Sequence, residues 1–249
     1  MRSEGTIAAG IGRSLRLYHG DRARLDRMIA FYGRFLGPGT LAFDIGAHVG
    51  DRTRVFRTLG ARVIAVEPQP GAARALRLIH GRDAGVTLIH AAAGAQPGVA
   101  SLRLNRANPT VSTLSDAFVD AAHGADGWHG QVWDGLVDVP VRTLDSLIAA
   151  HGRPDFIKID VEGLEDQVLD GLTQPVPALS FEMTTIQRAV ALRALRRTAK
   201  LGRYRYALAL GERFHLDSPW ETEGDMARRL QDLPQEANSG DVYARLESG

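Results

Sequence analysis

The chain has 249 residues, 30 Lys and Arg against 29 Asp and Glu, a formal net charge of +1 and no cysteine. This length suits one large α/β domain that buries roughly 70–75% of its unfolded surface. Without cysteine, disulfides, thiolate metal sites and a cysteine nucleophile are excluded. The balanced charge indicates neither a nucleic-acid nor an anionic-membrane partner, and no apolar run reaches about 18 residues, so we expect a cytoplasmic protein.

The first predicted element is a helix near the N-terminus. Residues 20–36 carry apolar side chains at helical spacing, and the following Gly37-Pro38-Gly39 would end the helix. We therefore expect an N-terminal helical extension over residues 1–39 and the main domain over residues 40–249.

Residues 41–67 have the layout of a nucleoside-binding β-α-β unit. An apolar strand begins at Leu41, and Gly46 and Gly50 allow a tight turn beneath a ligand. Glu67 follows the second strand, about 20 residues after Gly46, where a carboxylate can reach ribose hydroxyls.

The turn of this unit favours S-adenosylmethionine (SAM) over NAD. In a G-x-G-x-x-G turn the second glycine lets a pyrophosphate approach backbone N–H groups, but here that position is His48. Asp44 would repel a pyrophosphate, whereas it could meet the α-ammonium group of a methionine moiety. NAD remains the alternative.

Regular alternation continues after this unit and is then interrupted. We expect a helix over residues 70–79 and a third strand over residues 86–91. Residues 95–140 contain two more strand-like runs around a polar segment with Trp128 and Trp133, too long for a simple connection. This insert is either a lid or acceptor-binding element, or a surface elaboration whose tryptophans merely pack down.

A second informative region follows a short helix expected over residues 143–150. Residues 155–160, D-F-I-K-I-D, are typical of a buried strand. Lys158 lies inside this strand, where an unpaired ammonium would be very costly, and Glu182 in the next apolar run is the expected partner. The pattern favours a buried ion pair that fixes strand register over a chemical role for Lys158.

Asp160 and Glu162 stand where this strand ends. Ligands of open α/β sheets gather at the carboxyl ends of strands, so Asp160 is expected to be functional. Alternate residues of a strand share a face, which places Glu162 on the same side. Glu165 falls in the first turn of the next helix, where a negative charge suits the helix dipole, so we expect it to be structural.

The chain resembles the FkbM-type SAM-dependent methyltransferase family over about residues 40–185. The motifs that carry the resemblance are F-D-I-G-A-H-V-G (43–50), V-I-A-V-E-P-Q-P (63–70), T-L-D-S-L (143–147), F-I-K-I-D-V-E-G-L-E (156–165) and S-F-E (180–182). G-D-V-Y-A (240–244) looks like the closing strand of the same fold.

The resemblance implies an α/β fold with a Rossmann-like class I methyltransferase sheet of seven strands, mostly parallel with one antiparallel, and helices on both faces. It also implies SAM as cofactor, S-adenosyl-L-homocysteine as product, and O-methylation of a hydroxyl on a sugar, glycan or other natural product. Family members usually carry Asn at the position of His48. The alternatives are an NAD-dependent oxidoreductase and a non-catalytic SAM-binding module.

The predicted site combines these observations. The expected cofactor-binding residues are Asp44, Gly46, Ala47, His48, Gly50, Glu67, Pro68, Ala92 and Asp160. Asp160 is the first candidate for taking the acceptor proton and Glu162 the second, ahead of His48 and His90. Asp160 and Glu162 could instead hold a divalent metal, but two acids on one turn more often serve hydrogen bonds or ion pairs, so no metal is predicted.

Overall fold

The computed structural model describes residues 2–247 and contains two sheets. The helices are α1 (Arg2–His19), α2 (Arg22–Tyr32), α3 (Asp51–Thr58), α4 (Pro70–His80), α5 (Asp116–Ala122), α6 (Leu144–His151), α7 (Glu165–Asp170), α8 (Arg188–Leu201) and α9 (Glu223–Asp232), with 3-10 turns η1 (Pro109–Val111), η2 (Thr185–Gln187) and η3 (Gln235–Ala237). The strands are β1 (Leu41–Ile45), β2 (Arg62–Val66), β3 (Val86–Ile89), β4 (Ala92–Ala93), β5 (Gly98–Leu104), β6 (Gly135–Arg142), β7 (Phe156–Ile159), β8 (Ala178–Thr184), β9 (Tyr204–Leu210) and β10 (Ser239–Leu246).

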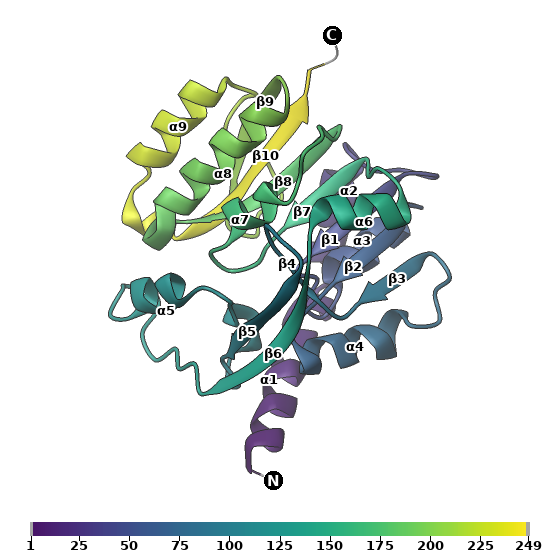
Figure 1. The fold of residues 1–249 in the computed structure, drawn as a ribbon, viewed down its shortest axis with the longest axis vertical. Helices are drawn as coiled ribbons and strands as arrows, with labels where there is room; N and C mark the ends of the chain where they lie inside the picture. Colours follow the sequence, from purple (N-terminus) through teal and green to yellow (C-terminus); the bar gives the residue numbers. More distant parts are fainter. Residues whose placement is uncertain (1, 248–249) are drawn as a thin grey trace.

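The main sheet has seven strands in the order β3-β2-β1-β7-β8-β10-β9 (Figure 1). Strand β10 runs antiparallel to both of its neighbours, and the other pairs are parallel. The chain moves outward from β1 to β3 and then returns to the other side of β1 at β7. This confirms the predicted sheet and places its switch point between β1 and β7, where open α/β sheets bind ligands.

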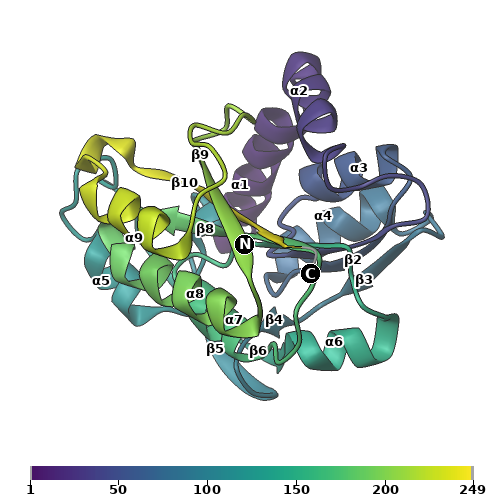
Figure 2. The ribbon, with the colours of Figure 1, turned by 90° about the horizontal axis from the view of Figure 1, so that it is seen from above.

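Helices cover both faces of this sheet, as predicted. The apolar side chains of β1 and β7 are buried throughout, as expected of central parallel strands. One core cluster joins the sheet to α6, α7, α8 and α9, and the other joins it to α2, α3 and α4 (Figure 2). None of the helices within residues 2–247 is long and apolar enough to cross a bilayer.

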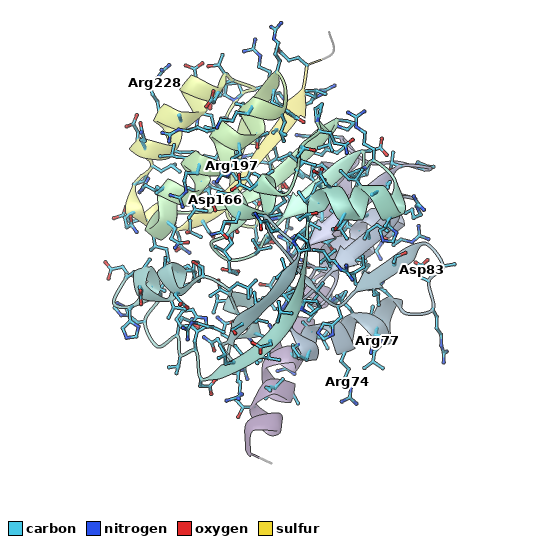
Figure 3. All side chains as sticks on the ribbon, viewed as in Figure 1. Arg74, Arg77, Asp83, Asp166, Arg197 and Arg228 are labelled. Atoms are coloured by element: carbon cyan, nitrogen blue, oxygen red, sulfur yellow. The ribbon has the colours of Figure 1, made fainter. Side chains whose placement is uncertain are left out.

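Ion pairs tie α7 to α8 on the first of these faces. Arg193 Nε lies 2.6 Å from Asp166 Oδ2. Arg197 Nε donates to the Asp166 carbonyl oxygen at 2.8 Å, and Figure 3 shows these two residues. Part of the arginine-rich surface of α8 therefore serves helix packing.

The N-terminal segment consists of two helices. Asp21 caps α2 by accepting a hydrogen bond from the backbone N–H of Arg24 at 3.0 Å, and Phe31 and Tyr32 are buried against the main sheet. Helix α1 packs on α4 through Ile11. The division of the chain at residue 39 remains a prediction.

Strands β5 and β6 of the insert join β4, which precedes the insert, in a second, three-stranded sheet with the order β4-β6-β5. The third strand of the main sheet ends at Ile89 rather than at residue 91, because the chain leaves to pair Ala92–Ala93 with β6. Trp128 and Trp133 pack edge-on against Phe118 of α5, with ring centroids 5.1 and 6.3 Å away.

Candidate active site

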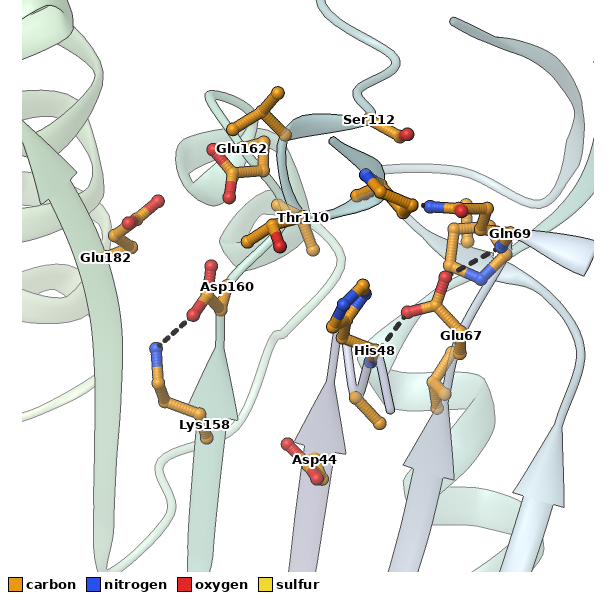
Figure 4. Close-up of a pocket in the computed structure, with 18 of the residues that line it drawn as sticks. Asp44, His48, Glu67, Gln69, Thr110, Ser112, Lys158, Asp160, Glu162 and Glu182 are labelled. Carbon is orange, nitrogen blue, oxygen red and sulfur yellow. Dashed lines mark hydrogen bonds and ion pairs between the residues drawn. The ribbon is translucent and has the colours of Figure 1, made fainter. Parts of the chain in front are cut away.

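A cavity of about 290 Å³ opens at the carboxyl ends of β1, β2 and β7 (Figure 4). One wall is the turn after β1, and the segments that follow β2 and β7 form the next two. The insert closes the cavity through η1 and Trp128. The cavity therefore lies at the switch point of the sheet, and its volume is near the lower end of the ~300–1,000 Å³ usual for ligand sites.

The turn after β1 requires glycine for its close packing. Gly46 has a φ of +82°, and a Cβ atom there would lie 1.7 Å from the Asp160 carbonyl oxygen. The backbone N–H groups of Gly46 and Ala47 donate to the Val66 carbonyl oxygen at 2.9 and 3.0 Å. This glycine thus lets the β1 turn lie directly against the segment after β7, and both Gly46 and Ala47 line the cavity.

Gly50 adopts a turn conformation, as expected, and its place in the cofactor site remains a prediction. Its backbone is left-handed, with a φ of +82°, and a Cβ there would meet Leu76 and His80 of α4 at 2.5 and 2.9 Å. The position is constrained by helix packing behind the turn rather than by the cavity wall.

Glu67 is buried at the end of β2 and is held by backbone donors. Its Oε2 accepts from His48 N at 2.8 Å and its Oε1 from Gln69 N at 2.7 Å. Burial raises the pKa of Glu67 to about 7, against the lowering effect of these two hydrogen bonds. The carboxylate is therefore fixed in place, and the remaining lone pair of each oxygen is available to a ligand hydroxyl.

His48 faces the cavity in a left-handed conformation, with a φ of +48°. Its ring contacts Tyr18 of α1 edge-on at 5.9 Å. Burial lowers the pKa of His48 to about 4, so the imidazole is neutral at physiological pH. Its Nε2 is buried without a hydrogen-bond partner among the described residues.

Asp44 and Arg52 both line the cavity next to the turn after β1. Asp44 Oδ2 accepts a hydrogen bond from Thr53 Oγ1 at 2.6 Å, and burial raises the pKa of Asp44 to about 6. Arg52 binds Asp51 at 2.7 Å and Glu212 at 2.6 Å, and its buried Nε has no partner within the described part of the chain. Arg52 could not be singled out from the sequence, because its place beside the cavity depends on an ion pair with the distant Glu212.

Lys158 is fully buried and forms two ion pairs, neither of them with Glu182. Its Nζ lies 3.1 Å from Asp160 Oδ2 and 2.8 Å from Asp241 Oδ1 of β10. Strand β8 lies between, and its residue opposite Lys158 is Ser180, whose small side chain leaves room for the lysine to pass. The prediction of Glu182 as the partner was therefore wrong, although a buried ion pair does form.

Three carboxylates meet beyond this lysine. One oxygen from each of Asp160, Glu162 and Glu182 lies within 4.8 Å of the others (Figure 4). Glu162 has a φ of +59°, and its carbonyl oxygen accepts from Thr113 Oγ1 of the insert at 2.6 Å. Burial and neighbouring acids raise the pKa values of Glu162 and Glu182 well above their usual range.

Of the other residues considered in the sequence analysis, some line the cavity and some do not. Pro68 and Ala92 line it, while His90 is exposed on the surface and its Nε2 lies 2.9 Å from the Pro68 carbonyl oxygen. Glu165 accepts from the backbone N–H groups of Val161 and Gly163 at 3.2 Å, which confirms its structural role.

These residues fit a SAM molecule. Glu67 offers a fixed acceptor for ribose hydroxyls, and Asp44 offers a buried anion near the β1 turn. The unpartnered polar atoms of His48 and Arg52 provide further hydrogen-bonding groups at the cavity wall. A sugar, an ammonium group and a carboxylate can thus each meet a complementary group.

Comparisons with known proteins identify the family. The family model described as Methyltransferase FkbM domain matches residues 44–205, the stretch that builds the sheet through β8 and most of the cavity. No protein of curated function matches the sequence.

Several solved structures are similar at low identity. Precorrin-6y C5,15-methyltransferase from Geobacter metallireducens is 12% identical, with a TM-score of 0.48 over 89% of this chain and 87% of that chain. A SAM-dependent O-methyltransferase from Thermotoga maritima is 12% identical (TM-score 0.43, 89% of this chain and 65% of that chain). Fibrillarin from Aeropyrum pernix, solved with natively bound SAM, is 11% identical (TM-score 0.40, 84% and 67%).

Proposed function

Because the chain belongs to the FkbM methyltransferase family, and is thus a SAM-dependent methyltransferase, we propose that it is an O-methyltransferase acting on a hydroxyl of a sugar, glycan or other natural product. The family assignment removes the nicotinamide-dependent oxidoreductase from consideration. A SAM-binding module without activity is the competing proposal.

For the cofactor, we assign ribose binding to the end of β2 and binding of the methionine part to the region of the turn after β1. Glu67 would accept hydrogen bonds from the ribose hydroxyls, and Asp44 would bind the methionine ammonium group, with Arg52 beside it for the carboxylate. Gly46, Ala47, His48, Pro68 and Ala92 would complete the contact surface. When bound, SAM supplies an electrophilic methyl carbon for transfer.

The catalytic half assigns proton removal to Asp160. An alcohol that keeps its O–H proton is a poor nucleophile, so a base positioned at the acceptor oxygen accelerates transfer. The Asp160 side chain is 30% exposed toward the cavity, and Lys158 holds its Oδ2 in place. Asp160 would take the hydroxyl proton as the new oxygen–carbon bond forms, with Glu162 as the second candidate.

One observation carries this proposal. The carboxylate cluster of Asp160, Glu162 and Glu182 lines the same cavity as Glu67, so the groups proposed to meet the acceptor and the nucleoside face one shared space. Carboxylates accept protons and hydrogen bonds from hydroxyl groups, which suits an alcohol acceptor.

The decisive experiment identifies the product. The purified chain would be incubated with SAM labelled in its methyl carbon and with extract from the source of the protein, and the labelled product would be analysed by NMR. A label on oxygen supports the proposal, and a label on nitrogen or carbon contradicts it. Binding of S-adenosylhomocysteine without transfer to any acceptor would indicate the non-catalytic module.

The same experiment tests the predicted partners. The expectation of a small-molecule or glycan acceptor, and of no nucleic acid, predicts that nuclease treatment of the extract leaves the labelled product unchanged. Loss of the product would instead indicate a nucleic-acid acceptor.

A further inference from the structure

The three carboxylates at the end of β7 and β8 have the spacing of a cation site. One oxygen each from Asp160, Glu162 and Glu182 lies within 4.8 Å of the others, and all three residues line the cavity. Hard divalent cations bind oxygen ligands at about 2.0–2.6 Å, so two ligands on opposite sides of an ion lie roughly 4–5 Å apart. The three oxygens can therefore reach one ion.

The charges in this region are not balanced by the protein. Lys158 is the cation paired with Asp160 in this cluster, and its ammonium group is already shared between Asp160 and Asp241. Glu162 and Glu182 have no hydrogen bond or ion pair to their carboxylates within residues 2–247. Two carboxylates so close together repel each other strongly when both are ionised, so the cluster needs either a proton or a cation between them.

Glu162 provides an independent indication of a ligand. Its side chain belongs to a residue that is only 8% exposed, and Figure 4 shows its carboxylate turned toward Asp160 and Glu182. Buried carboxylates nearly always have partners, because an unpaired buried charge is costly. The bond from Thr113 to the Glu162 carbonyl oxygen fixes the backbone that aims this side chain into the cluster.

We propose that Asp160, Glu162 and Glu182 bind one divalent hard cation, Mg²⁺ or Mn²⁺. The remaining coordination positions face the cavity and are open to water or to an acceptor oxygen. Resting on the proposed function, the cation would coordinate the acceptor hydroxyl and lower its pKa. The O–H proton would then pass to the oxygen of Glu162 that does not bind the cation, since Lys158 already holds the second oxygen of Asp160, while the acceptor oxygen bonds to the methyl carbon and the carbon–sulfur bond breaks.

The test measures Mn²⁺ binding to the full chain, without SAM or acceptor, by electron paramagnetic resonance after treatment with EDTA. We expect one Mn²⁺ per chain, displaced by Mg²⁺. Glu162→Gln and Glu182→Gln should each weaken binding at least about tenfold, since loss of an outer-shell partner alone costs that much. Glu236→Gln removes an exposed carboxylate and should leave binding unchanged.

Two readouts keep the test decisive. Thermal unfolding without metal and binding of S-adenosylhomocysteine establish that each variant folds. Two variants are used so that, if one fails to fold, the other still tests the site. Wild-type protein that binds no Mn²⁺ at millimolar concentration, or folded variants that bind it as well as wild type, would overturn the proposal.

The outcome also separates this site from the proposed function. Mn²⁺ binding with methyl transfer to nitrogen or carbon would leave the metal site standing and remove the O-methyltransferase. If methyl transfer to a hydroxyl is unaffected by EDTA and the protein binds no Mn²⁺, the O-methyltransferase proposal stands and the metal site is removed.

Discussion

Glu67 and Glu162 are both buried glutamates at the edge of one cavity, yet their carboxylates have opposite surroundings. Each oxygen of Glu67 accepts a backbone hydrogen bond, from His48 and from Gln69. Glu162 has none to its carboxylate within residues 2–247 and lies near two other acids. At the β2 end the protein itself supplies hydrogen-bond donors to the buried carboxylate. At the β7 end a proton, an acceptor or a cation must supply the partner that the Glu162 carboxylate lacks.

The largest effect is expected at the β7 end. Asp160→Asn removes the proposed base but keeps a side chain of the same shape, so the rate of methyl transfer should fall by about 10²–10⁴-fold. Binding of S-adenosylhomocysteine should change less than about tenfold, because Glu67 and Asp44 are untouched. Label transfer to the identified acceptor and calorimetry measure the two quantities, and an unchanged rate with intact binding would show that Asp160 is not the base.

A second prediction concerns the stability of the ion pair behind the cluster. Asp241→Asn takes one of the two carboxylates from the buried Lys158 ammonium, and should lower the free energy of unfolding by about 2–3 kcal/mol. Urea denaturation at neutral pH measures this change. Asp120→Asn on the exposed surface of α5 is the control, and equal stability of both variants would mean that Asp160 alone satisfies the lysine.

A third prediction concerns the β2 end, where the affinity for S-adenosylhomocysteine should depend on pH through Glu67. The pKa of Glu67 is raised from 4.5 to about 7, so the carboxylate is mostly protonated at pH 6 and ionised at pH 8. If ribose hydroxyls bind the ionised form, affinity for S-adenosylhomocysteine should increase about tenfold from pH 6 to pH 8. Calorimetry at several pH values measures it.

Two carboxyls titrate in this window, and a variant separates them. Asp44 has a pKa of about 6 and would act in the same direction through the ammonium group. Glu67→Gln should therefore abolish the increase above pH 7 and keep the part near pH 6. An unaltered profile in this variant would place the ribose elsewhere.

The sheet was predictable because its strands are apolar in the manner of central parallel strands and alternate with amphipathic helices. The residues at the carboxyl ends of β1, β2 and β7 followed from that order, since these ends meet at one edge. Contacts across distant segments were not predictable. Lys158 reaches Asp241 because β10 lies beside β8 in the sheet, and this strand order is not visible in the local pattern.

The insert marks the same limit. Its strands were recognisable, but their pairing into a separate sheet with Ala92–Ala93 was not, so the third strand was extended two residues too far. The acceptor-side role of residues 95–140 remains a prediction, supported by the η1 and Trp128 contributions to the cavity wall. The packing constraint on Gly50 likewise comes from a separate segment, since a Cβ atom there would meet α4 behind the turn.

The smallest effect is expected where a carboxylate has no partner to lose. Without metal, Glu182→Gln removes repulsion from Glu162 and breaks no hydrogen bond formed by the carboxylate within residues 2–247, so the free energy of unfolding should stay within about 0.5 kcal/mol of wild type or rise. Added Mn²⁺ should then stabilise wild type more than the variant, because the incomplete cluster binds the ion at least about tenfold more weakly. Thermal unfolding with and without Mn²⁺ measures both. A large loss of stability in metal-free Glu182→Gln would mean that Glu182 already has a partner in the fold, and the contrast between the two ends of the cavity would no longer hold.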